Sequence, residues 1–411
     1  MKITIICHYY PPEIGAPSAR ISEMAKYWVK EGHEVQVVTC FPNHPTGVIP
    51  EKYRGLKYLR EEADGITIHR SYVYATPNKG FIKKTIGHIS FMFSSVLFCL
   101  KKTGKADVVI TSSPTFFSIF SGYYFSRRKN IPFILEIRDL WPAAIVELGV
   151  LKNKFIINLL ERMEMFFYRK SNKLVMVTKA FKQNLIDRGI KEDKIEVVTN
   201  GYDEGLYYVQ DRDNDLVRTY NLENKFVVGY VGAHGISQAL DKIICVAEQL
   251  KGENDIQFVF IGEGADKEKL IKMVEEKGLS NVLFIDAQPK HMIPKFYGIS
   301  DVCLIPLRNI ELFKTFIPSK MFEILACGVP IVASVEGEAA EILRESGGAI
   351  VVPPEDVNAI KEAIIRIKTH PELKGEMGEK GLKFVKKYYT RQALSNKYLD
   401  IINKTLEEYK R

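Results

Sequence analysis

The sequence predicts an α/β protein made of two doubly wound parallel-sheet domains. Strand-like and helix-like segments alternate along almost all of its 411 residues, and such alternation is typical of βαβ units and a parallel sheet. The alternation comes in two series, which the polar and charged stretch 200–225 separates as a linker. A chain of this length is long enough for two domains.

The first series begins with the apolar run "KITIICHYY". Residues 18–31 then carry apolar side chains at helical spacing and end at Gly32. Residues 43–75 are less regular, with room for extra strands. The later strands of this series are "HEVQVVTC", "ADVVITSSP", "IPFILEI", "KLVMVTK" and "KIEVVTN".

The second series predicts a sheet of similar size. Its strands are "FVVGYVGAHG", "IQFVFIGEG", "NVLFIDA", "DVCLIPL", "PIVASVEG" and "AIVVPPED". The predicted domains are therefore 1–200 and 201–381, and a charged helix over 382–411 packs back on the first domain. Ligands of doubly wound sheets bind beyond the carboxyl ends of the strands, so we expect the functional residues there.

The charge is uneven between the two halves. Residues 1–200 carry 30 Lys and Arg against 18 Asp and Glu, a net charge of +12, and residues 201–411 carry 28 against 32, a net charge of −4. A basic half favours an anionic partner, but charge alone favours the alternative, a solvated surface. The basic half lacks a helix-turn-helix or aromatic-interleaved pattern, which argues against nucleic acid. Six cysteines without a CxxC pair predict buried free thiols in a reducing, cytoplasmic compartment.

The stretch "FIPSKMFEILACGVPIVAS", residues 316–334, predicts an anion site. Pro318 suits the first turn of a helix, where Lys320 is unfavourable unless an anion binds there. A diphosphate can take the helix N–H groups, Lys320 and Arg308 together. Glu323, one turn deeper, can accept hydrogen bonds from a ribose diol. The alternative is that Lys320 is solvated and pairs with Glu323.

Glycine-bearing loops follow the first strand of each series. Gly15 lies in the first of these loops, and Gly232 and Gly235 flank His234 in the second. Such loops let backbone N–H groups approach a phosphate or a sugar. The alternative is that they are tight turns, with an exposed ring at His234.

Polar residues also end two strands of the first domain. "EIRDLWP" places Arg138, Asp139 and Trp141 at a strand end, and "PNHPTG" does the same for Asn43 and His44. Charges at the carboxyl end of a parallel strand indicate a ligand site. The alternative for Arg138 and Asp139 is an ordinary ion pair.

The apolar segment "FIKKTIGHISFMFSSVLFCLKK", residues 81–102, has a lysine pair near each end. It is too short to span a bilayer. Two interpretations remain open, a helix of the core and an amphipathic helix on a membrane surface.

Together these stretches resemble the retaining glycosyltransferases of family 4, which have the GT-B fold of two Rossmann-like domains facing across a cleft. Within that family the chain is most similar to the bacterial O-antigen and capsule branch of N-acetyl-L-fucosamine transferases. The resemblance extends over nearly the whole chain. It rests on "YYPPEIGAPSARISEMAKYWVKEGHEVQVVT", "FPNHPTG", "EIRDLWP", "GAHGISQALD" and "PSKMFEILACGVPIVAS".

The resemblance implies that the C-terminal domain binds a nucleotide sugar and the N-terminal domain an acceptor. Glu323 matches the glutamate that holds the ribose, whereas Thr315 stands where the family usually has a second glutamate. Ala233 and His234 stand where an Arg and Lys pair is usual, and Arg138 stands near the usual place of a histidine. The residues expected to bind the donor are Gly15, Gly232, His234, Gly235, Arg308, Ser319, Lys320 and Glu323. Those expected to be catalytic are Lys320, Glu323, Arg138 and Asp139, and those expected to bind the acceptor are Asn43, His44 and Trp141.

The implied activity is transfer of a sugar from a UDP-sugar to a lipid-linked saccharide during surface polysaccharide synthesis. The resemblance favours an N-acetylated deoxyhexosamine such as N-acetyl-L-fucosamine as the sugar and a polyprenyl-diphosphate saccharide as the acceptor. We expect a retaining reaction with no metal and no other cofactor, at the cytoplasmic face of the membrane and in peripheral contact with it. The alternatives are a nucleotide-sugar 2-epimerase of the same two-domain fold and a binding protein without catalysis.

Overall fold

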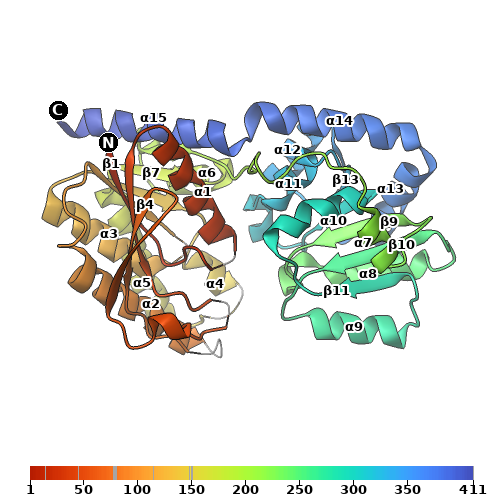
Figure 1. The fold of residues 1–411 in the computed structure, drawn as a ribbon, viewed down its shortest axis with the longest axis horizontal. Helices are drawn as coiled ribbons and strands as arrows, with labels where there is room; N and C mark the ends of the chain where they lie inside the picture. The colour runs from red at the N-terminus through yellow and green to blue at the C-terminus, as the bar shows by residue number, and fades with distance from the viewer. Residues whose placement is uncertain are drawn as a thin grey trace. The chain divides into compact units, whose positions relative to one another are not determined.

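The computed structural model describes all of residues 1–411 except 14, 45, 77–80, 114, 148, 150 and 411. The chain forms two compact units (Figure 1). Unit 1 comprises Met1–Thr199 and Gln392–Arg411, and unit 2 comprises Asn200–Arg391. Each unit is built on one sheet, with helices on its faces.

The sheet of unit 1 has the strand order β3-β4-β2-β1-β5-β6-β7-β8, and its strands are parallel except β3. The strands are β1 (Lys2–Ile6), β2 (Glu34–Cys40), β3 (Tyr58–Ala63), β4 (Ile66–Ser71), β5 (Val108–Ser112), β6 (Phe133–Ile137), β7 (Lys173–Met176) and β8 (Ile195–Val197). The helices are α1 (Ala16–Lys30), α2 (Phe81–Ser94), α3 (Phe116–Lys129), α4 (Ala143–Glu147), α5 (Lys154–Lys170), α6 (Lys179–Asp187) and α15 (Arg391–Lys410). A π turn over Ser95–Cys99 continues α2.

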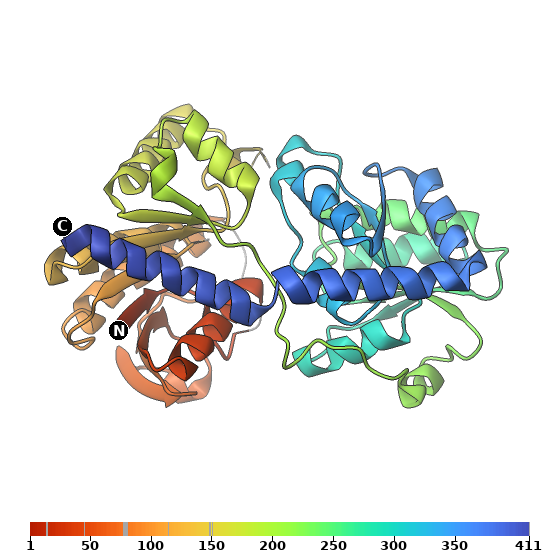
Figure 2. The same cartoon turned by 90° about the horizontal axis from the view of Figure 1, so that it is seen from above.

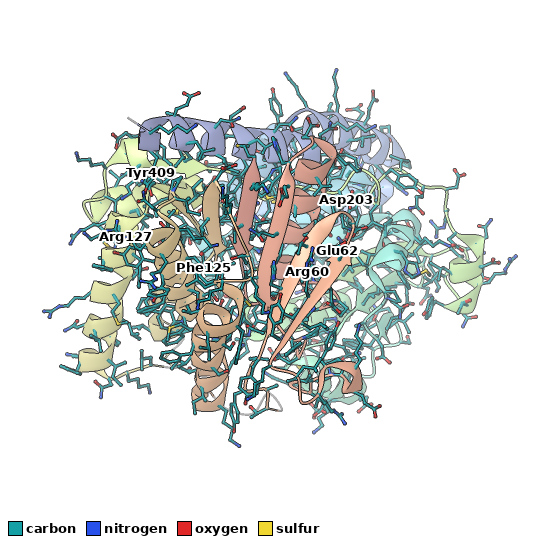
Figure 3. All side chains as sticks on the ribbon, turned by 60° about the vertical axis from the view of Figure 1, so that its left-hand side comes forward. Arg60, Glu62, Phe125, Arg127, Asp203 and Tyr409 are labelled. Atoms are coloured by element: carbon teal, nitrogen blue, oxygen red, sulfur yellow. The ribbon has the colours of Figure 1, made fainter. Side chains whose placement is uncertain are left out.

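The irregular region 43–75 contains the two extra strands that its sequence leaves room for, β3 and β4. They form an antiparallel hairpin at the edge of the sheet. Arg60 and Glu62 of the edge strand form an exposed ion pair with an N–O distance of 2.7 Å (Figure 3). Charged side chains on an edge strand disfavour pairing with a further strand.

The sheet of unit 2 is parallel throughout, with the order β11-β10-β9-β12-β13-β14. Its strands are β9 (Phe226–Val231), β10 (Ile256–Ile261), β11 (Val282–Ile285), β12 (Val302–Pro306), β13 (Ile331–Ser334) and β14 (Ala349–Val352). Its helices are α7 (Asn214–Thr219), α8 (Leu240–Gln249), α9 (Lys267–Glu276), α10 (Ile293–Ile299), α11 (Lys320–Ala326), α12 (Glu338–Ser346), α13 (Val357–Thr369) and α14 (Pro371–Tyr388).

The stretch 200–225 is not a linker, contrary to expectation. It belongs to unit 2 and contains α7. Tyr202, Val217 and Leu222 are buried in the core of that unit, beside residues of β9. The charged residues between them hide this in the sequence, because only a few apolar anchors are needed to fix an extended segment against a sheet.

The chain returns to unit 1 at Gln392, later than the expected position 382. Helix α14 stays with unit 2 because its glycines allow close packing: a β-carbon at Gly378 would lie 2.3 Å from the carbonyl oxygen of Gly328. Helix α15 lies across unit 1 (Figure 2). There the indole N–H of Trp28 donates to the carbonyl of Ser395 over 3.1 Å, and its ring packs on Tyr398.

The central strands of both units are buried on both faces, as is usual for a parallel sheet covered by helices. The side chains of these strands therefore pack in the cores, and the loops beyond the strand ends are the places where such folds bind ligands. Among the helices that the structure describes, none combines the length and apolar character needed to cross a membrane.

Candidate functional site

The carboxyl edge of the unit 2 sheet holds the main group of predicted site residues. Strand β9 lies between β10 and β12 in the sheet. After β9 the chain adds β10 and β11 on one side of it, and then β12, β13 and β14 on the other side. Doubly wound folds bind ligands at such a reversal of strand order, beyond the carboxyl ends of the strands. We call this place, between the loops after β9 and β12, the crevice of unit 2. The loop after β9 carries Gly232 and His234, and the segment after β12 leads into α11 at Lys320.

Lys320 and Gly232 lie in contact within this crevice. The Lys320 ammonium is 4.0 Å from the centre of the Tyr230 ring, and a β-carbon at Gly232 would lie 2.4 Å from Lys320 Nζ. Burial lowers the pKa of Lys320 to about 8, and the carboxylate of Glu323 partly opposes that shift. A desolvated ammonium beside a glycine backbone is suited to hold an anion, because its attraction for a negative charge is weakly screened.

Glu323 and Ser319 lie on the same short helix as Lys320. The Glu323 carboxylate is partly buried and accepts a hydrogen bond of 3.4 Å from the Tyr297 hydroxyl. Ser319 is the residue immediately before α11, and its side chain makes no capping hydrogen bond to the helix. The structure therefore brings Gly232, Ser319, Lys320 and Glu323 to one edge of the sheet, as the sequence predicts.

Gly262 and Gly264 support this crevice, although neither is among the predicted site residues. Gly232 and Gly262 both have φ near +144°, which favours glycine. A β-carbon at Gly262 would lie 2.0 Å from the carbonyl oxygen of Gly232, and one at Gly264 would lie 2.2 Å from the carbonyl oxygen of His234. The signal in the sequence is the stretch "IGEG", which follows β10 as "VGAHG" follows β9.

The ring of His234 is buried, so the alternative interpretation, a tight turn with an exposed ring, is wrong, and a donor contact at His234 stays a prediction. Its residue is 0% exposed, and the ring packs among Tyr230, Phe260 and Phe284. Neither ring nitrogen has a hydrogen-bond partner among the described residues. Burial lowers the pKa of His234 to about 4, and the neutral ring belongs to the apolar layer. Its neighbour Gly235 donates its N–H to the Gln238 side chain over 3.2 Å.

The guanidinium of Arg308 is held by two carboxylates. Its Nη2 lies 2.6 Å from Asp241 and its Nη1 lies 2.9 Å from Glu355, and its Nε donates to the carbonyl of Ile236 over 3.1 Å. The hydrogen bond that Arg308 donates to the Asp241 carboxylate is the main reason why the pKa of Arg308 is raised. Its predicted contact with a diphosphate stays a prediction, and it would compete with both ion pairs.

The carboxyl edge of the unit 1 sheet holds the second group of predicted residues. Gly15 precedes α1 with φ 146°, a conformation that favours glycine. Glu13, which the sequence does not single out, accepts hydrogen bonds from the backbone N–H groups of Tyr10, Asn43 and His44 at 3.3, 2.8 and 2.9 Å. Burial raises the pKa of Glu13, against the effect of these hydrogen bonds. Glu13 thus ties together the loops after β1 and β2.

Three histidines gather beside these loops. His8 follows β1, and its ring lies 4.6 Å from that of His88 on α2. The Tyr9 ring lies between His8 and His44: its centre is 4.9 Å from that of the His8 ring and 5.3 Å from that of the His44 ring. Burial lowers the pKa of all three histidines, to about 4 for His88. His8 could have been inferred from its place at a strand end, but His88 lies within a helix and is brought here only by packing.

The stretch after β6 places Arg138, Asp139 and Trp141 at the same edge. The backbone N–H of Arg138 donates to the Ser113 hydroxyl over 3.2 Å. Burial raises the pKa of Asp139, and the charge of Arg138 opposes the shift. The Trp141 ring stacks on Phe116 at 4.5 Å, which leaves its role in acceptor binding a prediction.

Two family models match the chain in succession. The glycosyl transferase 4-like domain matches residues 15–201, and the glycosyl transferases group 1 model matches residues 211–384. Together they account for most of the chain. The chain belongs to the group 1 glycosyltransferases.

One distant relative matches this glycosyltransferase along most of its length. WcaI of Escherichia coli (strain K12), a glycosyl transferase assigned to colanic acid biosynthesis, is 26% identical over 374 residues, which cover 89% of this chain and 91% of that protein.

Two solved structures share the fold. Sucrose-phosphate synthase from Thermosynechococcus elongatus superposes with a TM-score of 0.76 at 16% identity, over 99% of both chains. Anabaena Alr3699/HepE, solved with UDP and glucose, has a TM-score of 0.74 at 15% identity, over 98% of this chain and 99% of that one. The GT-B fold expected for this glycosyltransferase is thereby confirmed.

We expect Gly262→Ala to lower the free energy of unfolding of unit 2 of this glycosyltransferase by about 3 kcal/mol or more. The added β-carbon would meet backbone atoms of Gly232, and the φ of this position disfavours any other residue. Calorimetry measures the loss. Tryptophan fluorescence should keep the wild-type midpoint, since Trp28 and Trp141 both lie in unit 1.

The matched control for Gly262 is Gly252→Ala. A β-carbon at Gly252 meets no atom within 4 Å, so its effect on stability should stay within about 1 kcal/mol. Equal unfolding temperatures for the two variants would contradict the tight packing of the loops after β9 and β10.

Proposed function

We propose that this glycosyltransferase transfers a sugar from a UDP-sugar to a lipid-linked saccharide in polysaccharide synthesis, with retention of configuration. The observation that carries the proposal is the Lys320 ammonium beside Gly232 in the crevice of unit 2. The similarity to Alr3699/HepE, which was solved with UDP and glucose, supports a UDP-linked donor. The similarity to WcaI, which is assigned to colanic acid biosynthesis, supports a polysaccharide product.

In the proposed reaction, cleavage of the bond between sugar and phosphate leaves negative charge on the diphosphate. Lys320 stabilises that charge, because it is already in place and desolvated before the reaction. Glu323 accepts hydrogen bonds from the ribose, which orients the donor. The acceptor hydroxyl attacks from the face of the leaving group, and the leaving phosphate takes its proton. Asp139 of unit 1 assists that transfer.

The finer parts of the proposal concern the sugar, the acceptor and the place of the reaction. We propose an N-acetylated deoxyhexosamine such as N-acetyl-L-fucosamine as the sugar and a polyprenyl-diphosphate saccharide as the acceptor, at the cytoplasmic face of the membrane. We also propose that the reaction needs no metal. The described residues contain no group of three or more His, Cys, Asp or Glu placed to hold one.

The test is release of UDP from a panel of UDP-sugars, with and without lipid-linked saccharide and in the presence of EDTA. We expect release that depends on acceptor and survives EDTA. An epimerised nucleotide sugar formed without acceptor would contradict the transferase. Loss of activity in EDTA that magnesium or manganese restores would contradict the metal-independent reaction alone.

We expect the affinity for the UDP-sugar to be about tenfold lower at pH 9 than at pH 7, because the pKa of Lys320 is about 8 in the free protein. Above that pH the ammonium loses the proton that attracts the diphosphate. Two neighbours of Lys320 do not titrate in this range, since burial raises the pKa of Tyr230 and Cys303, the latter to about 12. Titration calorimetry measures the affinity, and Lys320→Met should make it independent of pH over this range.

A further inference from the structure

One face of unit 1 carries an apolar groove between α2 with its π turn, α3 and α5. The groove has a volume of about 600 Å³, and only apolar and aromatic residues line it: Met92, Phe93, Val96, Leu97, Phe120, Tyr123, Tyr124, Phe166 and Phe167. Its rim is open to solvent, with Phe93 65% and Leu97 74% exposed. Side chains this apolar and this exposed, gathered in one place, mark an interaction surface.

The fold explains why these side chains point outward. Phe91 and Cys99 of the same segment are fully buried against the sheet, so the segment 81–102 is a core helix on one face. Ile86, Phe93 and Leu97 recur at helical spacing on the opposite face and are exposed. The core interpretation of this segment is therefore confirmed for one face, and the opposite face is apolar and exposed.

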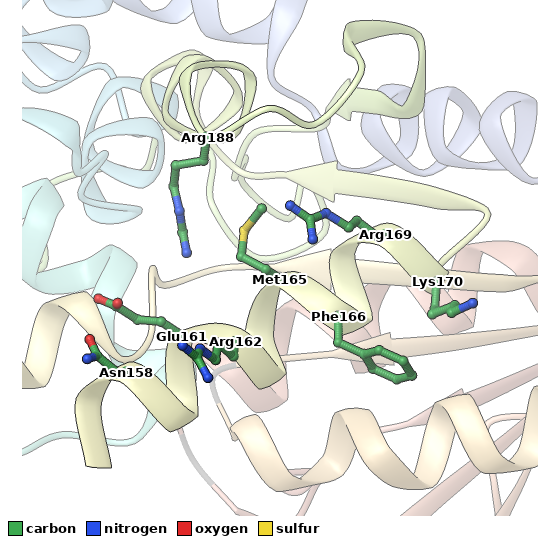
Figure 4. A pocket seen from close by; sticks show the side chains of 8 residues that line it. All are labelled: Asn158, Glu161, Arg162, Met165, Phe166, Arg169, Lys170 and Arg188. Carbon is green, nitrogen blue, oxygen red and sulfur yellow. The ribbon is translucent and has the colours of Figure 1, made fainter. Parts of the chain in front are cut away.

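Cations lie on the rim of the groove. The Arg128 guanidinium is 5.8 Å from the centre of the Tyr124 ring, and the Lys170 ammonium is 5.9 Å from that of Phe166. Phe166 also borders a second hollow, of about 880 Å³, in which it lies with Lys170 (Figure 4). That hollow is lined by Asn158, Glu161, Arg162, Met165, Phe166, Arg169, Lys170 and Arg188, so four of its eight residues are cationic and one is acidic.

We propose that this face of unit 1 docks on an anionic lipid bilayer. Phe93 and Leu97 enter the boundary between headgroups and acyl chains, and Arg128 and Lys170 contact the lipid phosphates. Aromatic side chains with cations beside them suit that boundary, where one end of the pair is apolar and the other wet. A second copy of the chain fits less well, because it would bring two basic faces together. The inference agrees with the proposed lipid-linked acceptor but does not need it.

Sedimentation with vesicles tests the docking. We expect the protein to bind phosphatidylcholine vesicles that contain phosphatidylglycerol, and to bind pure phosphatidylcholine vesicles at least tenfold more weakly. Added salt should weaken the binding, because salt screens the attraction over about 10 Å at 0.1 M. The assay contains no nucleotide sugar, so its result does not depend on the proposed transferase activity. Equal and negligible pelleting with both vesicles would overturn the docking.

Two sets of variants separate the insertion of apolar side chains into the bilayer from the attraction of cations to anionic lipid. Phe93→Ser with Leu97→Ser should lower vesicle affinity at least tenfold, whereas Tyr388→Ser should not. Tyr388 is the matched control because it is an exposed aromatic residue of unit 2 with the Lys387 ammonium 4.8 Å from its ring centre. Wild-type binding by the double variant with an unchanged circular dichroism spectrum would overturn insertion at the groove.

The charge pair is Arg128→Glu with Lys170→Glu, which should remove the preference for phosphatidylglycerol. Lys383→Glu with Lys386→Glu makes the same change of charge on exposed residues of α14 and should leave the preference intact. Equal losses in both pairs would overturn a specific docking face. A dimer seen in sedimentation equilibrium and lost in Phe93→Ser would assign the groove to a second copy of the chain instead.

Discussion

Replacing Lys320 by methionine is expected to lower the rate of sugar transfer by about a hundredfold or more. A β-carbon at Gly232 would lie only 2.4 Å from this ammonium, so the ammonium lies beside the glycine backbone. Removal of one preorganised stabilising group typically costs 10²–10³ in kcat, which is about 2.7–4 kcal/mol. Methionine keeps most of the volume beside Tyr230, so the packing of α11 should survive. Initial rates of UDP release at saturating acceptor measure the effect.

The control for Lys320 is Lys380→Met, which removes an ammonium whose side chain is 61% exposed on α14. Its rate should match that of the wild-type enzyme. A Lys320→Met enzyme that folds normally and turns over at the wild-type rate would contradict the proposal that Lys320 stabilises the leaving diphosphate. A variant that loses affinity for UDP but keeps kcat would show that Lys320 binds the ground state and the transition state equally.

Replacing Arg20 by methionine is expected to lower the free energy of unfolding of unit 1 by about 3–5 kcal/mol. Arg20 Nε lies 2.9 Å from Glu136 Oε1, and the two side chains are 1% and 0% exposed. Without Arg20 the Glu136 carboxylate stays buried. Among the side chains of the described residues, the Ser112 hydroxyl then still donates a hydrogen bond to it, over 2.5 Å. Arg20 also donates to the carbonyls of Val198 and Thr199, where the chain leaves unit 1.

Fluorescence of the two tryptophans, both in unit 1, follows this loss during unfolding by denaturant. Arg60→Met is the matched control, because the Arg60–Glu62 pair is 58% and 68% exposed and should contribute less than about 1 kcal/mol. The double variant of Arg20→Met and Glu136→Leu should be more stable than Arg20→Met alone, since it leaves no buried charge. Equal losses at Arg20 and Arg60 would contradict the structural role of the buried pair.

The effect of Arg20→Met should depend on pH. Burial by itself raises the pKa of Glu136, but Arg20, Arg138 and the Ser112 hydroxyl outweigh it and lower the pKa below its ordinary value. A group whose pKa is lowered in the folded state stabilises that state above the pKa of the unfolded chain and loses this contribution as the pH falls. The difference between wild type and Arg20→Met should therefore shrink in acid.

The predictable part of the site is local in sequence. Gly232 and Lys320 each follow a strand of the same sheet, and the carboxyl ends of parallel strands share one edge, so their proximity could be expected from their positions. Gly15, Asn43 and His44 follow strands of the unit 1 sheet in the same way. The buried ring of His234 could not be foreseen, because the loop sequence does not show that its side chain turns into the apolar layer beside Phe260 and Phe284.

By itself, the sequence determined the alternation of strands and helices, the two sheets and the glycine turns at their edges, because these depend on side-chain periodicity and on backbone freedom within a few residues. Only the tertiary structure decided which charged side chains are paired with an opposite charge. Arg20 meets Glu136 across 116 residues, Arg308 is held by Asp241 and Glu355, and Lys320 is left beside Gly232 with a lowered pKa. The physical reason is that the state of a charge depends on desolvation and on partners from distant segments, and both exist only once the chain has folded.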